Sequence, residues 1–286
     1  MDKKPDNIDS NGIDLHCHSV FSDGLLSPAR LVDLAAANGI STLAITDHDT
    51  MAGVNEARQY GRARGILVVP GIEFSVCHNE TNIHLLGYGL DASNANLKKL
   101  LAAIQVARVA RNERIIEKLN VLGYKISIEQ LPDTGCGQLG RPHIASLLVD
   151  KKIVHSEDEA FRRFLRRGAA AYVPRDIVAA HTAMDIITAA GGLAVLAHPG
   201  ILGFSEARID NLINGLYELG LHGIEVYHPA NNKKMCLLLA DICCAKKLLR
   251  TGGSDFHGRS RDKSSLGEYG GGRRIPSEIK TILKKL

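Results

Sequence analysis

Short apolar runs rich in β-branched residues alternate along the chain with longer segments whose apolar residues recur at helical spacing. The runs predict seven strands, at 13–18, 41–46, 66–74, 82–88, 193–198, 223–228 and 248–254. Helical patterns separate most of them, as at 27–39 and 51–65. Because strands that alternate with helices form parallel sheets, we predict an α/β fold with a parallel sheet. Seven such strands suggest a barrel related to the (β/α)₈ type.

The alternation stops after residue 90. Residues 95–122 have the pattern of one long helix, and residues 124–190 hold shorter helices between loops interrupted by prolines. The strand pattern resumes at residue 193. We therefore predict two domains, a barrel formed by 1–94 and 191–286, and a mainly helical cap formed by 95–190 and inserted over the barrel mouth.

The composition narrows the class of protein. Of the 286 residues, 45% are hydrophobic, which is enough for a packed core, and no run approaches the roughly 20 apolar residues of a membrane helix. The N-terminus has no apolar segment of the signal-peptide kind, so we expect a cytoplasmic protein with no membrane partner. A net charge of +4 is too small for a nucleic-acid coat protein and suits a small anionic substrate or a short nucleic acid bound at one end.

The cysteines give no sign of a metal or redox site. Six are present, and no two of them form a CxxC pair. This spacing argues against a zinc ribbon and against a thioredoxin-like site. In a cytosolic protein we expect them to be reduced and mostly buried. They are Cys17, Cys77, Cys136, Cys236, Cys243 and Cys244.

Histidines and carboxylates gather at the strand ends, where a barrel of this type keeps its active site. His16 and His18 are two positions apart on the first strand, so their imidazoles point to one face. Asp255 and His257 repeat this spacing after the last strand. The predicted metal ligands are His16, His18, Asp23, His48, Glu73, His84, His198, Asp255 and His257.

Nine such side chains exceed the needs of one ion, so we expect two or three divalent cations. Nitrogen and oxygen ligands without thiolates favour Mn²⁺, with Zn²⁺ or Fe²⁺ as alternatives. A single histidine is more often an ordinary core or surface residue, and it is the shared placement at strand ends that favours metal binding. His228 also ends a strand, and it is a candidate either for proton transfer or for orienting a ligand.

Six motifs carry a resemblance to a known family. They are DLHCHSVFSDG (14–24), ITDHDT (45–50), PGIEFS (70–75), HLLGY (84–88), AHPG (197–200) and GGSDFHG (252–258). In this order they resemble the polymerase-and-histidinol-phosphatase (PHP) family, which implies a distorted (β/α)₇ barrel with a di- or trinuclear metal site. Within the family, the chain is most similar to stand-alone bacterial phosphoesterases that act on 3′,5′-nucleotide bisphosphates. The group has a helical insertion where residues 95–190 stand here, and RVARNERIIEKL (108–119) and GRPHIA (140–145) resemble it.

The resemblance also implies how three ions would share the ligands. His16, His18, Glu73 and Asp255 would hold the first ion. Glu73, His84 and His198 would hold the second, and Asp23, His48 and His257 the third.

Basic residues of the insertion are candidates for substrate binding. Arg108, Arg111 and Arg114 recur every three residues, which is typical of a solvated helix face, but a place above the metal centre favours phosphate contact for Arg108 and Arg111. Arg141 and His143 of GRPHIA are similar candidates, and Asp23 is expected to lie beside the substrate. We interpret Arg162, Arg163, Arg166 and Arg167 as surface charge, with electrostatic guidance of RNA as the alternative.

The sequence therefore predicts a metal-dependent phosphoesterase. We expect it to remove the 3′-phosphate of 3′,5′-nucleotide bisphosphates to give 5′-nucleotides; relatives in the group also trim short 5′-phosphorylated RNA from the 5′ end, so short RNA is a second expected partner. The alternatives are a histidinol-phosphate phosphatase or other small phosphomonoesterase, and a non-catalytic metal-binding module, which the intact ligand set disfavours. No obligate protein partner is evident.

Overall fold

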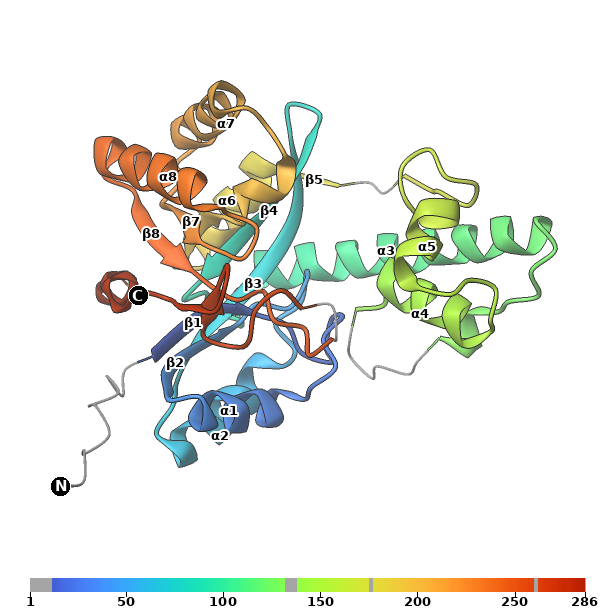
Figure 1. The fold of residues 1–286 in the computed structure, drawn as a ribbon, viewed down its shortest axis with the longest axis horizontal. Coiled ribbons are helices and arrows are strands. Elements are labelled where there is room, and N and C mark those ends of the chain that lie inside the picture. Colours follow the sequence, from blue (N-terminus) through green and yellow to red (C-terminus); the bar gives the residue numbers. More distant parts are fainter. Residues whose placement is uncertain (1–11, 132–137, 175–176, 260–261, 286) are drawn as a thin grey trace.

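The computed structural model describes residues 12–131, 138–174, 177–259 and 262–285, and its centre is a mixed β-sheet (Figure 1). Its strands follow the order β1 (Gly12–Cys17), β2 (Ile40–Ile45), β3 (Leu67–His78), β4 (Thr81–Tyr88), β6 (Leu193–Leu196), β7 (Gly223–Tyr227) and β8 (Leu249–Gly252). The short β5 (Val178–Ala179) pairs with β3 outside this path, and β9 (Glu268–Tyr269) and β10 (Arg273–Arg274) form a separate two-stranded sheet. All seven predicted strands are present, each within a few residues of its expected bounds.

The prediction of a parallel sheet is wrong at β4, which runs antiparallel to both of its neighbours, β3 and β6. The reason is a tight hairpin between β3 and β4. Asn79 and Glu80 both have positive φ, at 44° and 61°, as the two central residues of a type I′ hairpin turn do. The remaining neighbours on the path are parallel. The reversal places the beginning of β4 beside the carboxyl-terminal half of β3.

The two ends of the strand path approach each other beyond β8. Cys17 forms an isolated parallel bridge with Phe256, and the Asp255 backbone N–H donates to the His16 carbonyl at 2.9 Å. The architecture of the described residues is thus a mixed α/β sheet whose edges meet just after β8. A closed barrel stays a prediction.

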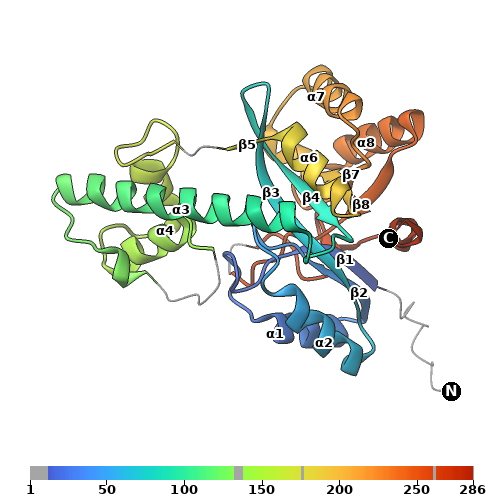
Figure 2. The same ribbon diagram turned by 180° about the vertical axis from the view of Figure 1, so that it is seen from behind.

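Helices cover the sheet in two groups (Figures 1 and 2). α1 (Pro28–Ala37) and α2 (Val54–Arg64) lie together beside β1 and β2, while α6 (Ala180–Ala189), α7 (Glu206–Glu218) and α8 (Lys233–Lys246) lie beside β6 to β8. Local signals set these helices. The Ser27 side chain caps α1 by accepting from the Arg30 N–H, and Pro28 occupies the first turn, where a missing N–H costs nothing. The inward face of α1 then buries Leu31 and Val32.

α3 (Ala95–Val121) confirms the predicted long helix and leads to a second group of helices. This group holds η1 (Ile128–Gln130), α4 (Arg141–Asp150), α5 (Glu157–Ala160) and the π-helical turn η2 (Phe161–Leu165). It has a hydrophobic cluster of its own, which includes Ile115, Leu119, Ile144, Leu148 and Phe164. The chain then returns to the sheet through β5. Two 3₁₀ segments follow later in the chain, η3 (Pro199–Leu202) after β6 and η4 (Ser277–Lys284) after β10.

Two composition-based expectations can be compared with the described part of the chain. Cys17, Cys236 and Cys243 are buried free thiols, whereas Cys77 is half-buried and Cys244 is exposed; Cys136 lies outside the described residues. Among the described helices, none combines the length and apolar character needed to cross a membrane.

Candidate active site

Nine histidine and carboxylate side chains converge on one site, most of them from the end of a strand or the loop after it, and two, Glu73 and His84, from within a strand. They are His16 in β1, His18 just after it, Asp23 in the next loop, His48 after β2, Glu73 in β3, His84 in β4, His198 after β6, and Asp255 and His257 after β8. The fold therefore brings together all nine residues that the sequence predicts as metal ligands. We call this set the ligand cluster.

The backbone around the ligand cluster is unusually tight. His198 and Asp255 have positive φ, at 29° and 53°, which is costly for residues with a Cβ and is concentrated at functional sites. A Cβ on Gly253 would come within 2.1 Å of the His16 Cβ, so glycine is required for β8 to pass this close to β1. These features fix the positions from which the side chains project.

Glu73, only 1% exposed, lies at the centre of the cluster. Its Oε1 is 2.8 Å from both His84 Nδ1 and His198 Nε2. Its Oε2 is 2.8 Å from His48 Nδ1, 3.3 Å from His18 Nε2 and 3.5 Å from His16 Nε2. Burial alone would raise the pKa of Glu73, but the surrounding imidazoles hold it well below its usual range. One buried carboxylate thus remains ionised and faces five ring nitrogens.

Two further carboxylates extend the cluster on one side of Glu73. Asp255 Oδ1 lies 3.2 Å from His18 Nε2 and 3.4 Å from His16 Nε2. Asp23 Oδ1 lies 3.3 Å from His257 Nε2. Potential ligand atoms of four residues, His18, Asp23, His48 and His257, all lie within 4.8 Å of one another. The cluster is therefore extended, with room for more than one cation.

The chemistry of the donors fits divalent cations. Among the described residues, the buried atoms His48 Nδ1 and Glu73 Oε2 have no hydrogen-bond partner of suitable geometry, although they lie 2.8 Å apart. His16 Nε2 and His18 Nε2 are 3.2 Å apart, so two ring nitrogens point at the same space. Buried polar atoms left without partners are costly, and a cation that accepts several lone pairs would satisfy them together.

A supporting carboxylate, Glu225, was missed by the sequence analysis. It is fully buried in the middle of β7, with Oε1 2.9 Å from His16 Nδ1, and its Oε2 accepts the His198 backbone N–H at 2.7 Å. This carboxylate orients the ring of His16 from behind, as partners of metal-binding histidines commonly do. The available signal was an acidic residue in the otherwise apolar run GIEVY, which a buried strand does not carry without a partner.

His228 lies beside the cluster, 2% exposed, with Nε2 3.4 Å from Asp255 Oδ2. Its Nδ1 accepts the backbone N–H of Ala230 at 3.0 Å. A neutral ring with this bond carries its proton on Nε2, on the side that faces the cluster.

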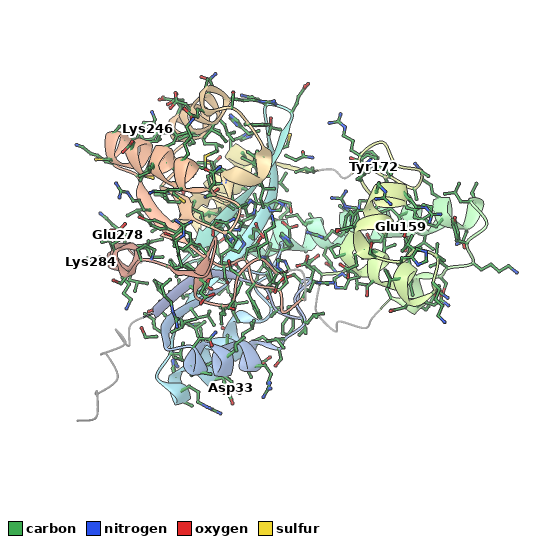
Figure 3. All side chains as sticks on the ribbon, in the orientation of Figure 1. Asp33, Glu159, Tyr172, Lys246, Glu278 and Lys284 are labelled. Atoms are coloured by element: carbon green, nitrogen blue, oxygen red, sulfur yellow. The ribbon has the colours of Figure 1, made fainter. Side chains whose placement is uncertain are left out.

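A cavity of about 270 Å³ connects the ligand cluster with the helical segment. Asp23, His48 and His84 border it from the cluster, and Arg108, Arg111, Arg141, His143 and Arg167 border it from the helical segment. Phe161 and Tyr172 add aromatic surface, and Figure 3 labels Tyr172 on the helical side of the molecule. All five residues predicted for substrate binding thus line one cavity. Arg167, interpreted from the sequence as surface charge, lines it as well.

The three regularly spaced arginines of α3, Arg108, Arg111 and Arg114, differ in how far they are buried. Arg108 and Arg111 are each 7% exposed and face the cavity, whereas Arg114 is exposed and does not line it. Arg108 is ion-paired with the buried Asp49, which also accepts the Ser75 N–H at 3.0 Å. Part of the charge of Arg108 is therefore used to join α3 to the loop after β2, a role that residue spacing alone does not indicate.

The two candidates from GRPHIA lie at the start of α4. Arg141 donates to the Leu165 carbonyl at 3.1 Å and has its guanidinium 5.9 Å from the centre of the Phe161 ring. His143 Nδ1 accepts the Gly140 N–H at 3.0 Å, so a neutral ring presents Nε2–H as a donor. Burial lowers the pKa of His143, which favours this neutral form.

Comparison with known proteins finds a match to the PHP domain over residues 14–176, more than half of the chain. Among characterised proteins, the chain is 34% identical to a 5′-3′ exoribonuclease of Haemophilus influenzae over 85% of its length and 89% of that protein. It is 33% identical to a phosphoribosyl 1,2-cyclic phosphate 1,2-diphosphodiesterase of Eggerthella lenta, covering 86% and 94% of the two chains. It is 34% identical to a 3′,5′-nucleoside bisphosphate phosphatase of Chromobacterium violaceum, covering 86% and 87%.

A solved structure supports the same relationship. A protein from Bifidobacterium adolescentis, described as a metal-dependent phosphoesterase, superimposes with a TM-score of 0.85 and 30% sequence identity. The superposition covers 96% of each chain. The shared fold therefore includes the helical segment as well as the sheet.

Proposed function

The chain belongs to the PHP domain family and is a hydrolase of phosphoester bonds, and we propose that its substrate is a 3′,5′-nucleotide bisphosphate. The enzyme would remove the 3′-phosphate and release a 5′-nucleotide. One observation carries this proposal: the arginines and His143 of the helical segment border the same cavity as the ligand cluster. A substrate with two phosphates can place one on the cluster and the other against these donors.

We propose that the ligand cluster holds two or three divalent ions, with Mn²⁺ as the first candidate. His16, His18, Glu73 and Asp255 would bind one ion, Glu73, His84 and His198 a second, and Asp23, His48 and His257 a third. Such ions, when bound, supply positive charge for the phosphate oxygens and acidify water. The shared carboxylate Glu73 and its five neighbouring imidazoles support this assignment.

The protein's own residues would orient the substrate. Arg111 and Arg141 present guanidinium groups, which suit the paired oxygens of a 5′-phosphate, and His143 adds a donor at Nε2. Phe161 and Tyr172 would cover the nucleoside. Asp23, which borders the cavity at the cluster, would lie beside the 3′-phosphate.

His228 would act at the scissile phosphate. Its Nε2 proton faces the cluster, 3.4 Å from Asp255, and the ring lies outside the arginine-lined cavity. Attack by water opposite the leaving ribose oxygen would therefore take place on the side of His228. We propose that His228 donates a hydrogen bond from its Nε2–H to a phosphate oxygen there, while one proton of the attacking water passes to the leaving ribose oxygen.

The proposed function also implies a division of the chain into two domains. We propose that 1–94 and 191–286 form one barrel-like domain and that 95–190 is a cap over its active site. The second hydrophobic cluster, confined to residues 115–173, supports a separately packed cap.

Turnover of three substrates with added Mn²⁺ tests the proposed function. We expect adenosine 3′,5′-bisphosphate to be hydrolysed much more efficiently than histidinol phosphate or p-nitrophenyl phosphate, because neither of the latter carries a second phosphate. Preference for histidinol phosphate would replace this proposal with the alternative phosphatase. No metal-stimulated phosphate release from any substrate would mean that the cluster is a non-catalytic metal site.

A further inference from the structure

The long helix α3 carries apolar residues on two opposite faces. One face is buried, and through Leu97, Ile104 and Ile115 it packs into the hydrophobic clusters of the sheet and of the helical segment. The other, which we call the outer face, is exposed or half-buried and consists of Ala102, Ala103, Val106, Val109 and Ala110. Val106 is 69% exposed and Val109 43%. The solvent side of a helix is usually polar, so a continuous apolar face there indicates a surface that binds another molecule.

Charged residues of opposite sign stand at the two ends of the outer face. The exposed Lys99 precedes Val106 by seven positions, and the exposed Glu113 follows it by seven. Because seven positions are close to two helical turns, both charges lie almost in line with Val106. Glu117 is exposed one turn beyond Glu113, and two like charges at this spacing disfavour an isolated helix. The outer face is thus basic at its beginning, apolar in the middle and acidic at its end.

The outer face is complementary to itself when one copy is reversed. Its residues fall into pairs that are equally distant from Val106 along the chain. The pairs are Ala103 with Val109, Ala102 with Ala110, and Lys99 with Glu113. When two identical helices pack antiparallel about a twofold axis, residues at equal distances on either side of that axis lie level with each other. An axis beside Val106 would therefore set Lys99 of each copy opposite Glu113 of the other, with small apolar side chains between the two helices.

We propose that the outer face of α3 binds a second copy of this chain, with the two helices antiparallel about a twofold axis at Val106. Parallel packing would instead set Glu113 against Glu113, and a partner of another sequence would have to carry the same order of charges that a second copy already has. Contact through one helix pair is smaller than the roughly 1,200 Å² of a standard stable interface, so the dimer is weak and reversible.

The arrangement of α3 determines what such a dimer would look like. The helix runs along the outside of the molecule from the sheet to the helical segment (Figure 2). Antiparallel pairing therefore sets the helical segment of one copy beside the sheet of the other. Arg108 and Arg111 line the first cavity from the side of α3 opposite Val106, so the interface leaves the cavity open and does not depend on which substrate binds there.

Sedimentation equilibrium of the full-length protein with Mn²⁺ tests the interface. The wild-type protein should change from monomer to dimer as its concentration rises from about 1 to about 300 μM. Val106→Glu sets two like charges at the twofold axis and should keep the protein monomeric over this range. The control is Leu237→Glu, which replaces a comparably exposed apolar residue of α8 (59%) and should dimerise as the wild type does. A wild-type protein that stays monomeric, or a Val106→Glu variant that still dimerises, would overturn the proposal.

Charge reversal tests the antiparallel register. Lys99→Glu and Glu113→Lys should each weaken the dimer by about 3- to 10-fold, because each lost ion pair occurs twice in a symmetric interface. The double variant should recover to within about threefold of wild type, since opposite charges face each other again. Both side chains are exposed, so circular dichroism should show all three variants folded. Single variants that dimerise as tightly as wild type, or a double variant that does not recover, would refute the proposed pairing.

Discussion

At the scale of single residues, Glu225 tests whether a side chain that only orients a metal ligand affects the affinity for metal. Glu225→Gln keeps the size of the side chain but removes the charge that faces His16 Nδ1 at 2.9 Å. Loss of such a partner typically costs about 10- to 100-fold in metal affinity or activity. We expect half-maximal activity to require correspondingly more Mn²⁺, measured by titrating metal-free enzyme. The control is Glu218→Gln on the exposed end of α7, and unchanged Mn²⁺ dependence in Glu225→Gln would contradict the assigned role.

Arg111 tests the separate site for the 5′-phosphate. Hydrogen bonds to a charged group stabilise by about 1.5–3 kcal/mol, so Arg111→Ala should lower kcat/KM for adenosine 3′,5′-bisphosphate by roughly one to two powers of ten. Hydrolysis of p-nitrophenyl phosphate should hardly change. Arg114→Ala, one turn further along α3 and exposed, is the matched control. An equal loss on both substrates would show that Arg111 supports the structure or the scissile phosphate instead.

The nine members of the ligand cluster were predictable from the sequence, whereas the residues that hold site residues in place were not. Placement at strand ends identified the nine members of the ligand cluster because chemistry in such sheets is carried there. Glu225 and Asp49 act through contacts with residues far away in the chain, at separations of 209 and 59 residues. An acidic residue in an apolar run indicates that Glu225 needs a partner, but neither spacing nor residue type reveals which residue that partner is, since the contact exists only after folding.

At the scale of secondary-structure elements, Arg259 joins the loop after β8 to both α5 and the loop that carries Asp23. It donates to the Asp23 carbonyl at 2.9 and 3.2 Å and lies 2.6 Å from Glu157 of α5. Arg259→Lys cannot reproduce this planar set of contacts. We expect kcat with adenosine 3′,5′-bisphosphate to fall about tenfold, with a higher Mn²⁺ requirement because Asp23 is less well positioned.

The matched control for Arg259→Lys is a substitution of another arginine that pairs with a glutamate of the helical segment. Arg163 forms an exposed pair with Glu159, so Arg163→Lys should leave both kcat and the Mn²⁺ requirement near wild type. If Arg259→Lys behaves in the same way, the contact with Asp23 has no influence on catalysis.

The direction of β4 shows why element-level prediction failed locally. Strand periodicity reports which face is buried and carries no information about direction. The hairpin turn uses Asn79 followed by Glu80, and it lacks the glycine that commonly marks a two-residue turn with positive φ. The reversal nevertheless serves the site, since His84 faces Glu73 from the strand beside it.

At the scale of the whole molecule, the metals should matter more for turnover than for folding. Three hydrophobic clusters supply the packed interior, so removal of metal by a chelator should abolish activity and leave the protein folded. The melting temperature should fall by a few degrees and recover with added Mn²⁺, because ions that bind the native state stabilise it by mass action. Circular-dichroism melts with activity assays would measure both effects. Full activity after exhaustive chelation would contradict a metal-dependent site.

The long helix α3 has a consequence for how the molecule unfolds. Its early residues Leu97 and Ile104 pack into the cluster around the sheet, and its later residues Ile115 and Leu119 pack into the cluster of the helical segment. One unbroken helix belongs to both hydrophobic clusters. If the packing of one cluster is lost, the helix frays from that end and loses backbone hydrogen bonds, which weakens the packing of the other cluster. Denaturant should therefore produce one cooperative transition with the steepness of a 286-residue unit, and a proline at Ala110 should split it into two.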